Sequence, residues 1–258
     1  MAYAPVSKAE QTNNDMMHVE KLIRDLPLKA RILDVGCFGF GLFQMSERCG
    51  RIDIENYGVD YSQPDNIPLG YRFSQIDLNH ALLPFPDDTF DFILASHVIE
   101  HLRDGVAFYL ECARILKPGG QFLVTCPSER SLLRNGFPFS YEKFCSTSFF
   151  DDPTHLGRPY SPQSLFRLAS YCSLKPMECG YEQSLLIKCL LPILVPYAWI
   201  SRDAVLLERV IWRGTGWASF LLAMKPSKAT GKLEFRYYIP YRSSPLLSKW
   251  MWIKRRFK

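Results

Sequence analysis

The sequence predicts an α/β protein with a doubly wound, mostly parallel sheet and helices on both faces. Five short apolar segments alternate with helical segments, and the first of them runs into a glycine-rich loop that opens a helix. This alternation is typical of parallel sheets that helices cover on both sides. Ligands bind such sheets at the carboxyl ends of the strands. The residues that follow each segment are therefore the candidate site.

Length and composition agree with a globular protein built as one elaborated domain. The chain has 258 residues, of which 47% are hydrophobic and 22% charged. Its eight cysteines are scattered without a CxxC pair, which excludes an evident zinc or disulfide framework and favours the cytoplasm. The N-terminal residues contain no apolar core after a basic start, so we expect no secretory signal.

The net charge of +5 is concentrated at the C-terminus. Residues 228–258 contain nine lysines or arginines and one acid, Glu234, so the rest of the chain carries a net charge of −3. Aromatic residues beside cations suit an anionic lipid surface. We expect no nucleic-acid partner, because no RNA-binding module is present, and we keep contact with a membrane surface open.

The N-terminal part predicts a helical cap over residues 1–27. Apolar residues from Met17 to Leu26 recur at helical spacing, and Pro27 ends the helix. A buried strand follows, ending at Asp34-Val35, and the next helix runs to about Arg48.

The glycine loop between this strand and this helix is a candidate nucleotide cradle, because glycines let a ligand lie against the backbone. The spacing Gly36-x-x-Gly39-x-Gly41 is not the dinucleotide fingerprint, and no Lys-Ser or Lys-Thr pair follows, as a Walker loop requires. The carboxylate of Asp34 suits a ligand with positive charge and no phosphate. S-adenosylmethionine is such a ligand.

The later strands place further polar residues at the same edge. The second strand (54–60) ends at Asp60, where doubly wound sheets bind ribose hydroxyls, and Tyr61 is placed to flank the adenine. The third (71–76) leads to Asp77-Leu78. The fourth (90–96) ends at Ser96-His97. A helix over 105–116, a turn at 117–120 and a fifth strand (121–126) follow.

Residues 32–127 resemble class I S-adenosylmethionine-dependent methyltransferases. The matching segments are ILDVGC, GVDYS, QIDLN, LPFPDDTFDFILASHVIEH and RILKPGGQFLVTCPS, in the order of that family. The resemblance implies a Rossmann-like fold with a final antiparallel strand, here 217–224, and S-adenosylmethionine as cofactor. It also places Asp77 beside the adenine amino group. The expected cofactor-binding residues are Asp34, Gly36, Cys37, Phe38, Gly39, Gly41, Asp60, Tyr61, Asp77, Leu78, Ser96 and His97.

One residue departs from the family pattern. The family reads D-x-G-x-G-x-G, whereas this loop reads as if Phe38 were inserted. Cofactor binding survives if the loop bulges outward. The alternative is a catalytically inactive protein that only binds the cofactor.

The segment from His97 to His101 spells H-x-x-E-H, which is also the inverted zinc-protease signature. That signature needs both histidines on one helix, and His97 adjoins a strand end, so we assign no metal ligands. Some quinone-type methyltransferases resemble this segment and hold a divalent ion with acids near this point, so whether the reaction uses a divalent metal stays open. We expect His101 to act as a general base near the methyl donor or to lie under the cofactor.

The polar, proline-rich stretch 149–162 follows the fifth strand and precedes a helix at 163–173. It resembles the D-P-T-H-x-R-P-Y segment of methyltransferases that modify sugars or lipid-linked glycans, although a simple capping turn stays an alternative. His155 is the preferred general base, because it lies in a loop with acids nearby. The expected substrate-binding residues are Asp152, Arg158 and Tyr160.

The apolar stretch 185–200 is interrupted by Lys188, Pro192 and Pro196, so it does not read as a membrane span. We expect a helical lid, with membrane-surface contact as an alternative. The predicted organisation is a cap (1–27), a methyltransferase domain (28–227) with substrate-side insertions at 128–160 and 185–213, and a basic aromatic tail (228–258).

These observations predict methyl transfer from S-adenosylmethionine to a small molecule. The expected acceptor atom is a hydroxyl oxygen of a sugar, glycan or lipid-linked intermediate. A peripheral membrane enzyme acting on quinones or lipids is the alternative. The sequence does not predict the oligomeric state.

Overall fold

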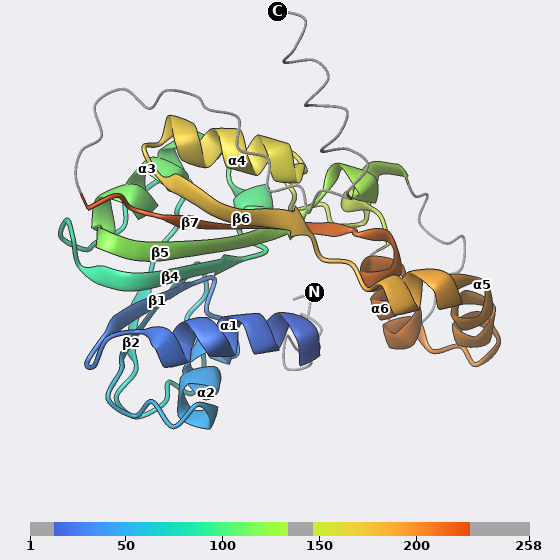
Figure 1. Ribbon diagram of the computed structural model, residues 1–258, viewed down its shortest axis with the longest axis horizontal. Coiled ribbons are helices and arrows are strands. Elements are labelled where there is room, and N and C mark those ends of the chain that lie inside the picture. Colours follow the sequence, from blue (N-terminus) through green and yellow to red (C-terminus); the bar gives the residue numbers. More distant parts are fainter. Residues whose placement is uncertain (1–12, 134–146, 228–258) are drawn as a thin grey trace, which may run out of the picture.

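The computed structural model describes residues 13–133 and 147–227 and contains a seven-stranded sheet with the strand order β3-β2-β1-β4-β5-β7-β6. The predicted α/β class, with helices on both faces of a mostly parallel sheet, is confirmed (Figure 1). Strands β1 to β5 are parallel, and β7 is antiparallel to both of its neighbours, β5 and β6. The strands are β1 (Arg31–Val35), β2 (Glu55–Asp60), β3 (Arg72–Gln75), β4 (Phe90–Ser96), β5 (Leu116–Pro127), β6 (Lys175–Tyr181) and β7 (Ala218–Met224).

Six α-helices and three short 3-10 helices accompany the sheet in the described residues. Among them, the N-terminal helix expected to end at Pro27 is α1, and the one expected at 163–173 is α4. The α-helices are α1 (Asn13–Asp25), α2 (Gly41–Arg48), α3 (Gly105–Ile115), α4 (Pro162–Tyr171), α5 (Leu185–Ile200) and α6 (Ala204–Thr215), and the 3-10 helices are η2 (Ile99–His101), η3 (Glu129–Leu133) and η4 (Phe149–Asp151).

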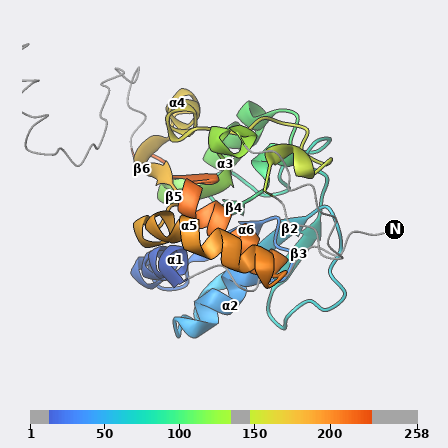
Figure 2. The same cartoon turned by 90° about the vertical axis from the view of Figure 1, so that its right-hand side faces the viewer.

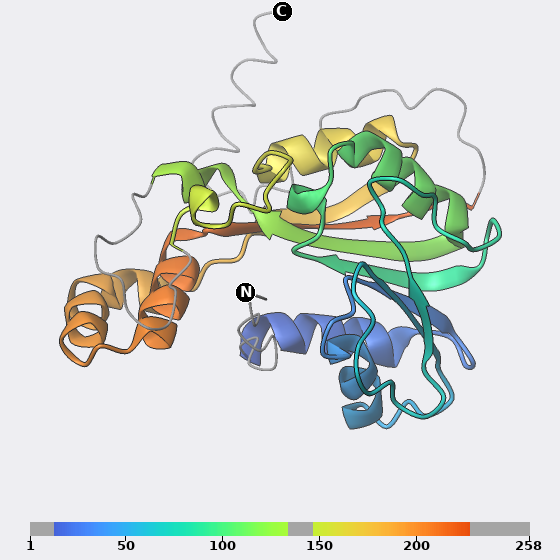
Figure 3. The ribbon, with the colours of Figure 1, turned by 180° about the vertical axis from the view of Figure 1, so that it is seen from behind.

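Alternating side chains along the central strands build one core on each face of the sheet. On β4, Phe92 packs with α1 and α2, whereas Ile93 and Ala95 face the core that α3 and α4 cover. This period of two is the geometry of an extended strand. Seen from behind, α3 and α4 lie together on one face and α1 and α2 on the other (Figure 3).

The sequence missed strand β6 and misjudged the turn at 117–120. Strand β6 contains Pro176 and Glu178 and lies at the sheet edge, where polar residues and proline are common but give no strand signal. The predicted turn is instead an irregularity within β5. Gly119, with φ of 83°, and Gly120 stay in the sheet through backbone hydrogen bonds with Lys225.

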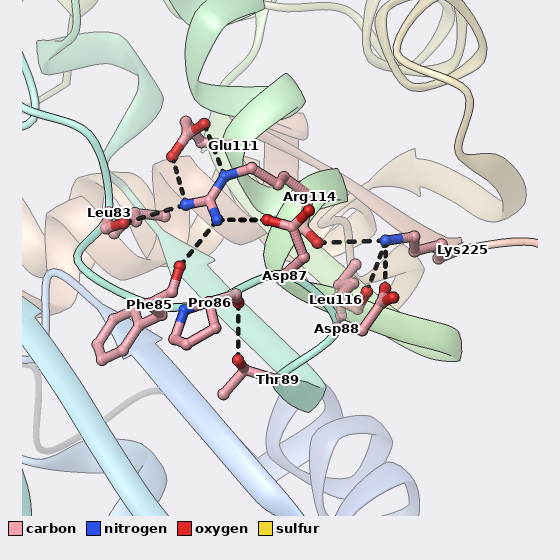
Figure 4. Close-up of polar contacts among 10 residues, drawn as sticks. All are labelled: Leu83, Phe85, Pro86, Asp87, Asp88, Thr89, Glu111, Arg114, Leu116 and Lys225. Atoms are coloured by element: carbon pink, nitrogen blue, oxygen red, sulfur yellow. Dashed lines mark hydrogen bonds and ion pairs between the residues drawn. The ribbon is translucent and has the colours of Figure 1, made fainter.

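The loop before β4 is held to the end of α3 by Arg114 (Figure 4). Its guanidinium donates to the carbonyl oxygens of Leu83 and Phe85 at 3.1 and 2.8 Å and to the carboxylates of Asp87 and Glu111. Hydrogen bonds to a charged donor are each stronger than neutral ones. Arg114 therefore fixes the proline-rich loop at the amino end of β4, at the opposite edge of the sheet from the candidate site.

Helices α5 and α6 form a hairpin inserted between β6 and β7, as the predicted helical insertion requires. Because β6 ends and β7 begins beside the end of β5, the hairpin lies at the carboxyl edge of the parallel strands (Figures 1 and 2). Within the described part of the chain, no helix has the length and apolar character needed to cross a membrane. The predicted tail (228–258) lies outside the described residues.

Candidate active site

The candidate site begins where four neighbouring parallel strands end. The order β3-β2-β1-β4 brings Asp77, Asp60, the glycine loop and His97 to one edge of the sheet. The loop is tied to the end of β2, since the backbone N–H groups of Gly36 and Cys37 donate to the carbonyl oxygen of Val59 at 2.8 and 3.3 Å. The strand order therefore places these residues at one edge of the sheet, as the sequence predicts.

A tight turn accommodates the extra residue in the glycine loop. The N–H of Phe40 donates to the carbonyl oxygen of Cys37 at 2.9 Å, and Gly39 has a φ of 85°. Positive φ at this third position is what a type II turn requires, and glycine adopts it without strain. Phe38 lies at the outer corner of the turn with 43% of its surface exposed. The loop therefore bulges outward at Phe38.

The side chain of Cys37 supports the loop from below. It is fully buried beside Tyr71, and burial raises the pKa of its thiol to about 12. Gly58 on β2 leaves space for both groups: a Cβ there would lie 1.9 Å from the Tyr71 hydroxyl and 2.7 Å from the Cys37 sulfur. The Cys37 thiol therefore contributes to packing, and the part of Cys37 that can contact a ligand is its backbone.

Carboxylates flank this loop on both sides. Asp34 on β1 is buried with 6% of its surface exposed. The Oδ1 atom of Asp60 accepts a hydrogen bond from the N–H of Ser62 at 2.9 Å, which orients the carboxylate at the strand end. Tyr61, the next residue, is 70% exposed.

The two residues expected beyond β3 have different environments. Asp77 interacts with the ring of His80 at 2.8 Å and accepts from the N–H of Asn79, and these contacts hold its pKa below the usual range. Leu78 is half-buried and packs against the main core. Its side chain therefore contributes to packing.

At the end of β4 the chain turns sharply at His97, which has a φ of 55°. Its Nδ1 atom lies 3.1 Å from Oε1 of Glu100, and its ring lies 5.5 Å from the ring of Trp212 on α6. Trp212 in turn stacks on Trp217 with a centroid distance of 4.1 Å. These aromatic contacts connect the α5–α6 hairpin to the site. The neighbouring Ser96 interacts with the hydroxyl of Thr125 across the sheet.

The two candidate bases, His101 and His155, lie side by side although 54 positions separate them in sequence. Their ring centroids are 4.9 Å apart. The Nδ1 of His155 lies 2.7 Å from the carbonyl oxygen of Phe149, and the Nδ1 of His101 lies 3.2 Å from that of Thr154. A carbonyl oxygen only accepts, so each Nδ1 carries its hydrogen and each neutral ring keeps its lone pair on Nε2.

Gly157 holds the loop of His155 against η2. Its N–H donates to the carbonyl oxygen of Glu100 at 2.8 Å. A Cβ at this position would lie within 3.2 Å of three carbonyl oxygens, those of Ile99, Glu100 and Leu102. A side chain at this position would press on backbone atoms that have little freedom to move, so glycine favours this approach of the His155 loop to η2.

Burial and hydrogen bonding shift the pKa values of two side chains in this loop, His155 and Asp152. Desolvation lowers the pKa of His155, which favours its neutral form near pH 7. Burial opposes ionisation of Asp152, but hydrogen bonds from the hydroxyl and the N–H of Thr154 outweigh it and lower the pKa of that carboxyl. Asp152 Oδ2 lies 3.8 Å from Nε2 of His155.

Glu100 is a member of this cluster that the sequence assignments missed. Only 1% of its surface is exposed, and its Oε2 atom has no hydrogen-bond partner among the described residues. Glu100, His101 and His155 each contribute one nitrogen or oxygen atom to a cluster in which the three atoms lie within 4.8 Å of one another. The H-x-x-E-H segment contained the signal for Glu100, but its link to His155 is a tertiary contact.

The three expected substrate-binding residues are not equivalent. Arg158 is exposed, and its guanidinium carbon lies 5.0 Å from the ring centre of Tyr160. Tyr160 itself is only 6% exposed and packs in the main core near Gly105. Its side chain is therefore a packing element, and we leave it out of the proposed acceptor contacts.

Comparison with known proteins places the central part of the chain in a family. Residues 33–124 match the family model described as "Methyltransferase domain". A probable S-adenosylmethionine-dependent methyltransferase of Mycolicibacterium smegmatis is 36% identical over 101 residues, which are 38% of each chain. A ubiquinone biosynthesis O-methyltransferase of Cereibacter sphaeroides is 36% identical over 98 residues, 35% of this chain and 38% of that protein. The matches thus span less than two fifths of these relatives.

Solved structures share the fold over most of the chain. A S-adenosylmethionine-dependent methyltransferase from Archaeoglobus fulgidus has a TM-score of 0.53 at 20% identity, covering 82% of this chain and 93% of that one. The Haemonchus contortus phosphoethanolamine N-methyltransferase 2, solved with S-adenosylhomocysteine, has a TM-score of 0.54 at 17% identity, covering 83% and 52%. The chain carries a class I methyltransferase domain, and S-adenosylmethionine is the cofactor of this class.

Proposed function

We propose that the protein transfers the methyl group of S-adenosylmethionine to a hydroxyl oxygen of a small molecule, in particular a sugar, a glycan or a lipid-linked intermediate. The observation that carries this proposal is the pairing of His101 and His155 at the same edge of the sheet as the glycine loop. A hydroxyl acceptor must lose its proton as it attacks the methyl group. Two imidazoles whose Nδ1 atoms face carbonyl oxygens, which leaves Nε2 to accept a proton, suit that task.

On the cofactor side, the proposal assigns contacts to the loop and the strand ends. The backbone of Gly36 to Gly41 surrounds the methionine end, and the carboxylate of Asp60 accepts hydrogen bonds from the ribose hydroxyls. Tyr61 flanks the adenine, and Asp77 lies beside the adenine amino group. The outward turn at Phe38 leaves the cradle backbone intact, which favours an active enzyme over one that only binds the cofactor.

On the acceptor side, most of the rate enhancement comes from holding the two reactants in line. Such positioning accounts for roughly 7–11 kcal/mol of barrier lowering, and a general base adds about 10²–10⁴-fold. His155 is the proposed base, with His101 beside it. Asp152 and Arg158 are the proposed acceptor contacts from the same loop.

An acceptor screen with a labelled methyl donor tests the proposal directly. Sugars, glycans, lipid-linked glycans and quinols form the panel, and the protein with His101 and His155 both replaced by glutamine is the control. We expect label on a hydroxyl-bearing acceptor and a strong loss of transfer in the double variant. Cofactor binding without transfer to any acceptor would contradict the proposal.

A second candidate is a peripheral membrane enzyme that methylates quinones or lipids. The observation that favours it is the apolar exposure of α5, since Leu185, Leu186, Ile193, Tyr197 and Ile200 are each more than 60% exposed. The similarity to a protein named as a ubiquinone biosynthesis O-methyltransferase points the same way. The acceptor panel and a vesicle-binding measurement described below separate the two candidates.

A further inference from the structure

Asn79 comes directly after the two cofactor residues expected beyond β3, and the proposed function gives it no role. Its side chain makes two hydrogen bonds to the segment that carries His101. Its Nδ2 donates to the carbonyl oxygen of His101 at 3.2 Å, and its Oδ1 accepts from the N–H of Arg103 at 2.9 Å. We propose that Asn79 is a positioning residue that couples the adenine contact of Asp77 to His101.

The two partners define the orientation of the Asn79 amide. The backbone N–H of Arg103 can only donate and the carbonyl oxygen of His101 can only accept, so the amide oxygen faces Arg103 and the amide nitrogen faces His101. This position therefore uses a short side chain with one donor and one acceptor. Aspartate would supply only the acceptor, and alanine would supply neither.

On the cofactor side, Asn79 belongs to the same tight turn as Asp77. The backbone N–H of Asn79 donates to Oδ1 of Asp77 at 2.9 Å, and the carbonyl oxygen of Asp77 accepts from the N–H of His80 at 3.0 Å. The Nδ1 of His80 lies 2.8 Å from Oδ2 of Asp77. Because the turn is closed by its own hydrogen bonds, a displacement of Asp77 also displaces Asn79.

On the acceptor side, His101 is held at two points. Asn79 binds its backbone carbonyl oxygen, and the hydroxyl of Thr154 lies 3.0 Å from Nδ1 of its ring. The N–H of His101 donates to the carbonyl oxygen of Val98 at 3.0 Å, which closes the turn of η2. A shift of Asn79 therefore moves the backbone that carries the ring, while the loop of Thr154 holds the ring itself.

This inference rests on the proposed function for two assignments, the adenine contact of Asp77 and the role of His101 as a base. Small displacements of a reacting group have large effects on rate, so a contact that fixes the backbone of His101 affects catalysis without touching a reactant. The coupling predicts that occupation of the cofactor site is detected at the ring of His101 before any acceptor is present.

The test follows the histidine ring protons by NMR while the full chain is titrated with S-adenosylhomocysteine. The chain has five histidines, and the resonances lost in His80→Gln and His101→Gln identify these two. In the unaltered protein we expect both resonances to shift together. In Asn79→Ala the His80 shift should remain, because His80 contacts Asp77 directly, whereas the His101 shift should be lost.

A second variant, Asn79→Asp, separates the two hydrogen bonds of the side chain. It keeps the acceptor for the N–H of Arg103 and removes only the donor to His101, so it should also lose the His101 shift. The control is Asn66→Ala, which removes an exposed asparagine in the connection between β2 and β3 and should leave both shifts unchanged. Circular dichroism checks that each variant is folded.

A His101 shift of unaltered size in folded Asn79→Ala and Asn79→Asp would overturn the proposal, because the cofactor would then reach His101 by another route. With an acceptor from the screen, Asn79→Asp should lower kcat at least about 10-fold. The same substitution should have no further effect in a His101→Gln background, and losses that multiply in the double variant would contradict the coupling. Calorimetric affinity for S-adenosylhomocysteine and methyl transfer by the unaltered protein report on the proposed function alone.

Discussion

At the scale of single residues, Asp60 carries the cofactor side of the proposed function. Its carboxylate is held at the end of β2 by the N–H of Ser62, one strand away from the glycine loop. Replacement by alanine removes a charged acceptor of two ribose hydroxyls. Hydrogen bonds to charged groups contribute about 1.5–3 kcal/mol, so Asp60→Ala should weaken S-adenosylmethionine binding roughly 10- to 100-fold by calorimetry.

The matched control for this measurement is Asp65→Ala, which removes an exposed acid a few residues further along the chain. Its affinity for the cofactor should equal that of the unaltered protein. Equal affinity in Asp60→Ala would mean that the assignment of the ribose site to the end of β2 is wrong.

His155 gives a prediction about pH. Because burial lowers the pKa of its imidazole, the unfolded chain binds more protons than the folded one below about pH 6.5. Its contribution to stability is therefore complete above pH 6.5 and is lost as the pH falls through the lowered pKa. Urea unfolding between pH 5 and 8 should show this loss in the unaltered protein and a flatter profile in His155→Gln.

The same pKa predicts the pH dependence of methyl transfer. Neutral His155 is required in the proposed reaction, so kcat/KM should decline with falling pH only below about pH 6.5. His155→Gln should lower kcat by about 10²–10⁴-fold. A decline centred above pH 7 would contradict the assignment of His155.

At the scale of elements, the approach of the loop 152–158 to η2 decides the geometry of the histidine pair. Gly157→Ala places a methyl group 3.0–3.2 Å from three backbone carbonyl oxygens, which cannot move as a flexible side chain does. The loop should shift and separate His155 from His101. We expect methyl transfer to fall at least about 10-fold with little change in S-adenosylmethionine affinity.

The control for this substitution is Leu156→Ala, which truncates an adjacent side chain that is 53% exposed. It should leave kcat within about twofold. If Gly157→Ala shows kinetics like Leu156→Ala, then contact of the loop with η2 is not needed for the reaction.

Another element-scale prediction concerns Arg114, which joins α3 to the loop before β4. Arg114→Ala leaves two carbonyl oxygens and the carboxylate of Glu111 without their charged donor, and should lower the free energy of unfolding by about 2–3 kcal/mol. Arg167→Ala, an exposed arginine on α4, should change it by less than about 0.5 kcal/mol. Denaturant unfolding measures both, and equal values would show that the Arg114 network adds no stability.

At the scale of the whole molecule, the α5–α6 hairpin presents an apolar surface at the edge of the sheet that carries the site. Helix α5 packs on α6 around Ala198 and leaves Ile193 and Ile200 exposed at 66% and 82%. If the membrane candidate holds, Ile193→Glu and Ile200→Glu should each reduce sedimentation with anionic vesicles several-fold. Ile52→Glu, at a residue 90% exposed but far along the chain in the α2–β2 connection, should not.

These variants also test the alternative that α5 covers a second copy of the chain. A mass measurement in solution, repeated for Ile193→Glu, reports on self-association. Vesicle binding that is equal for all three variants would remove the support that α5 gives to a membrane enzyme.

The sequence by itself determined the α/β class, the order of the strands along the chain and the glycine loop. The apolar segments show which residues form the strands, and this pattern is local. The points at which these segments stop therefore placed Asp34, Asp60, Asp77 and His97 at strand ends from the sequence alone. The antiparallel final strand followed from resemblance to the family. Edge strand β6 was missed, because a half-exposed strand with proline and glutamate has no clear apolar alternation.

The tertiary structure decided how the acceptor side of the site is assembled. His155 lies beside His101 and Glu100 where Gly157 packs closely on the backbone carbonyl oxygens of Ile99, Glu100 and Leu102, a contact between segments more than 50 positions apart. Burial also decided which assigned side chains are accessible: Tyr160 and Cys37 belong to packing, whereas Phe38 turns outward. Such contacts join residues that are far apart in the sequence, so they depend on how the whole chain folds and are not predicted by local sequence patterns.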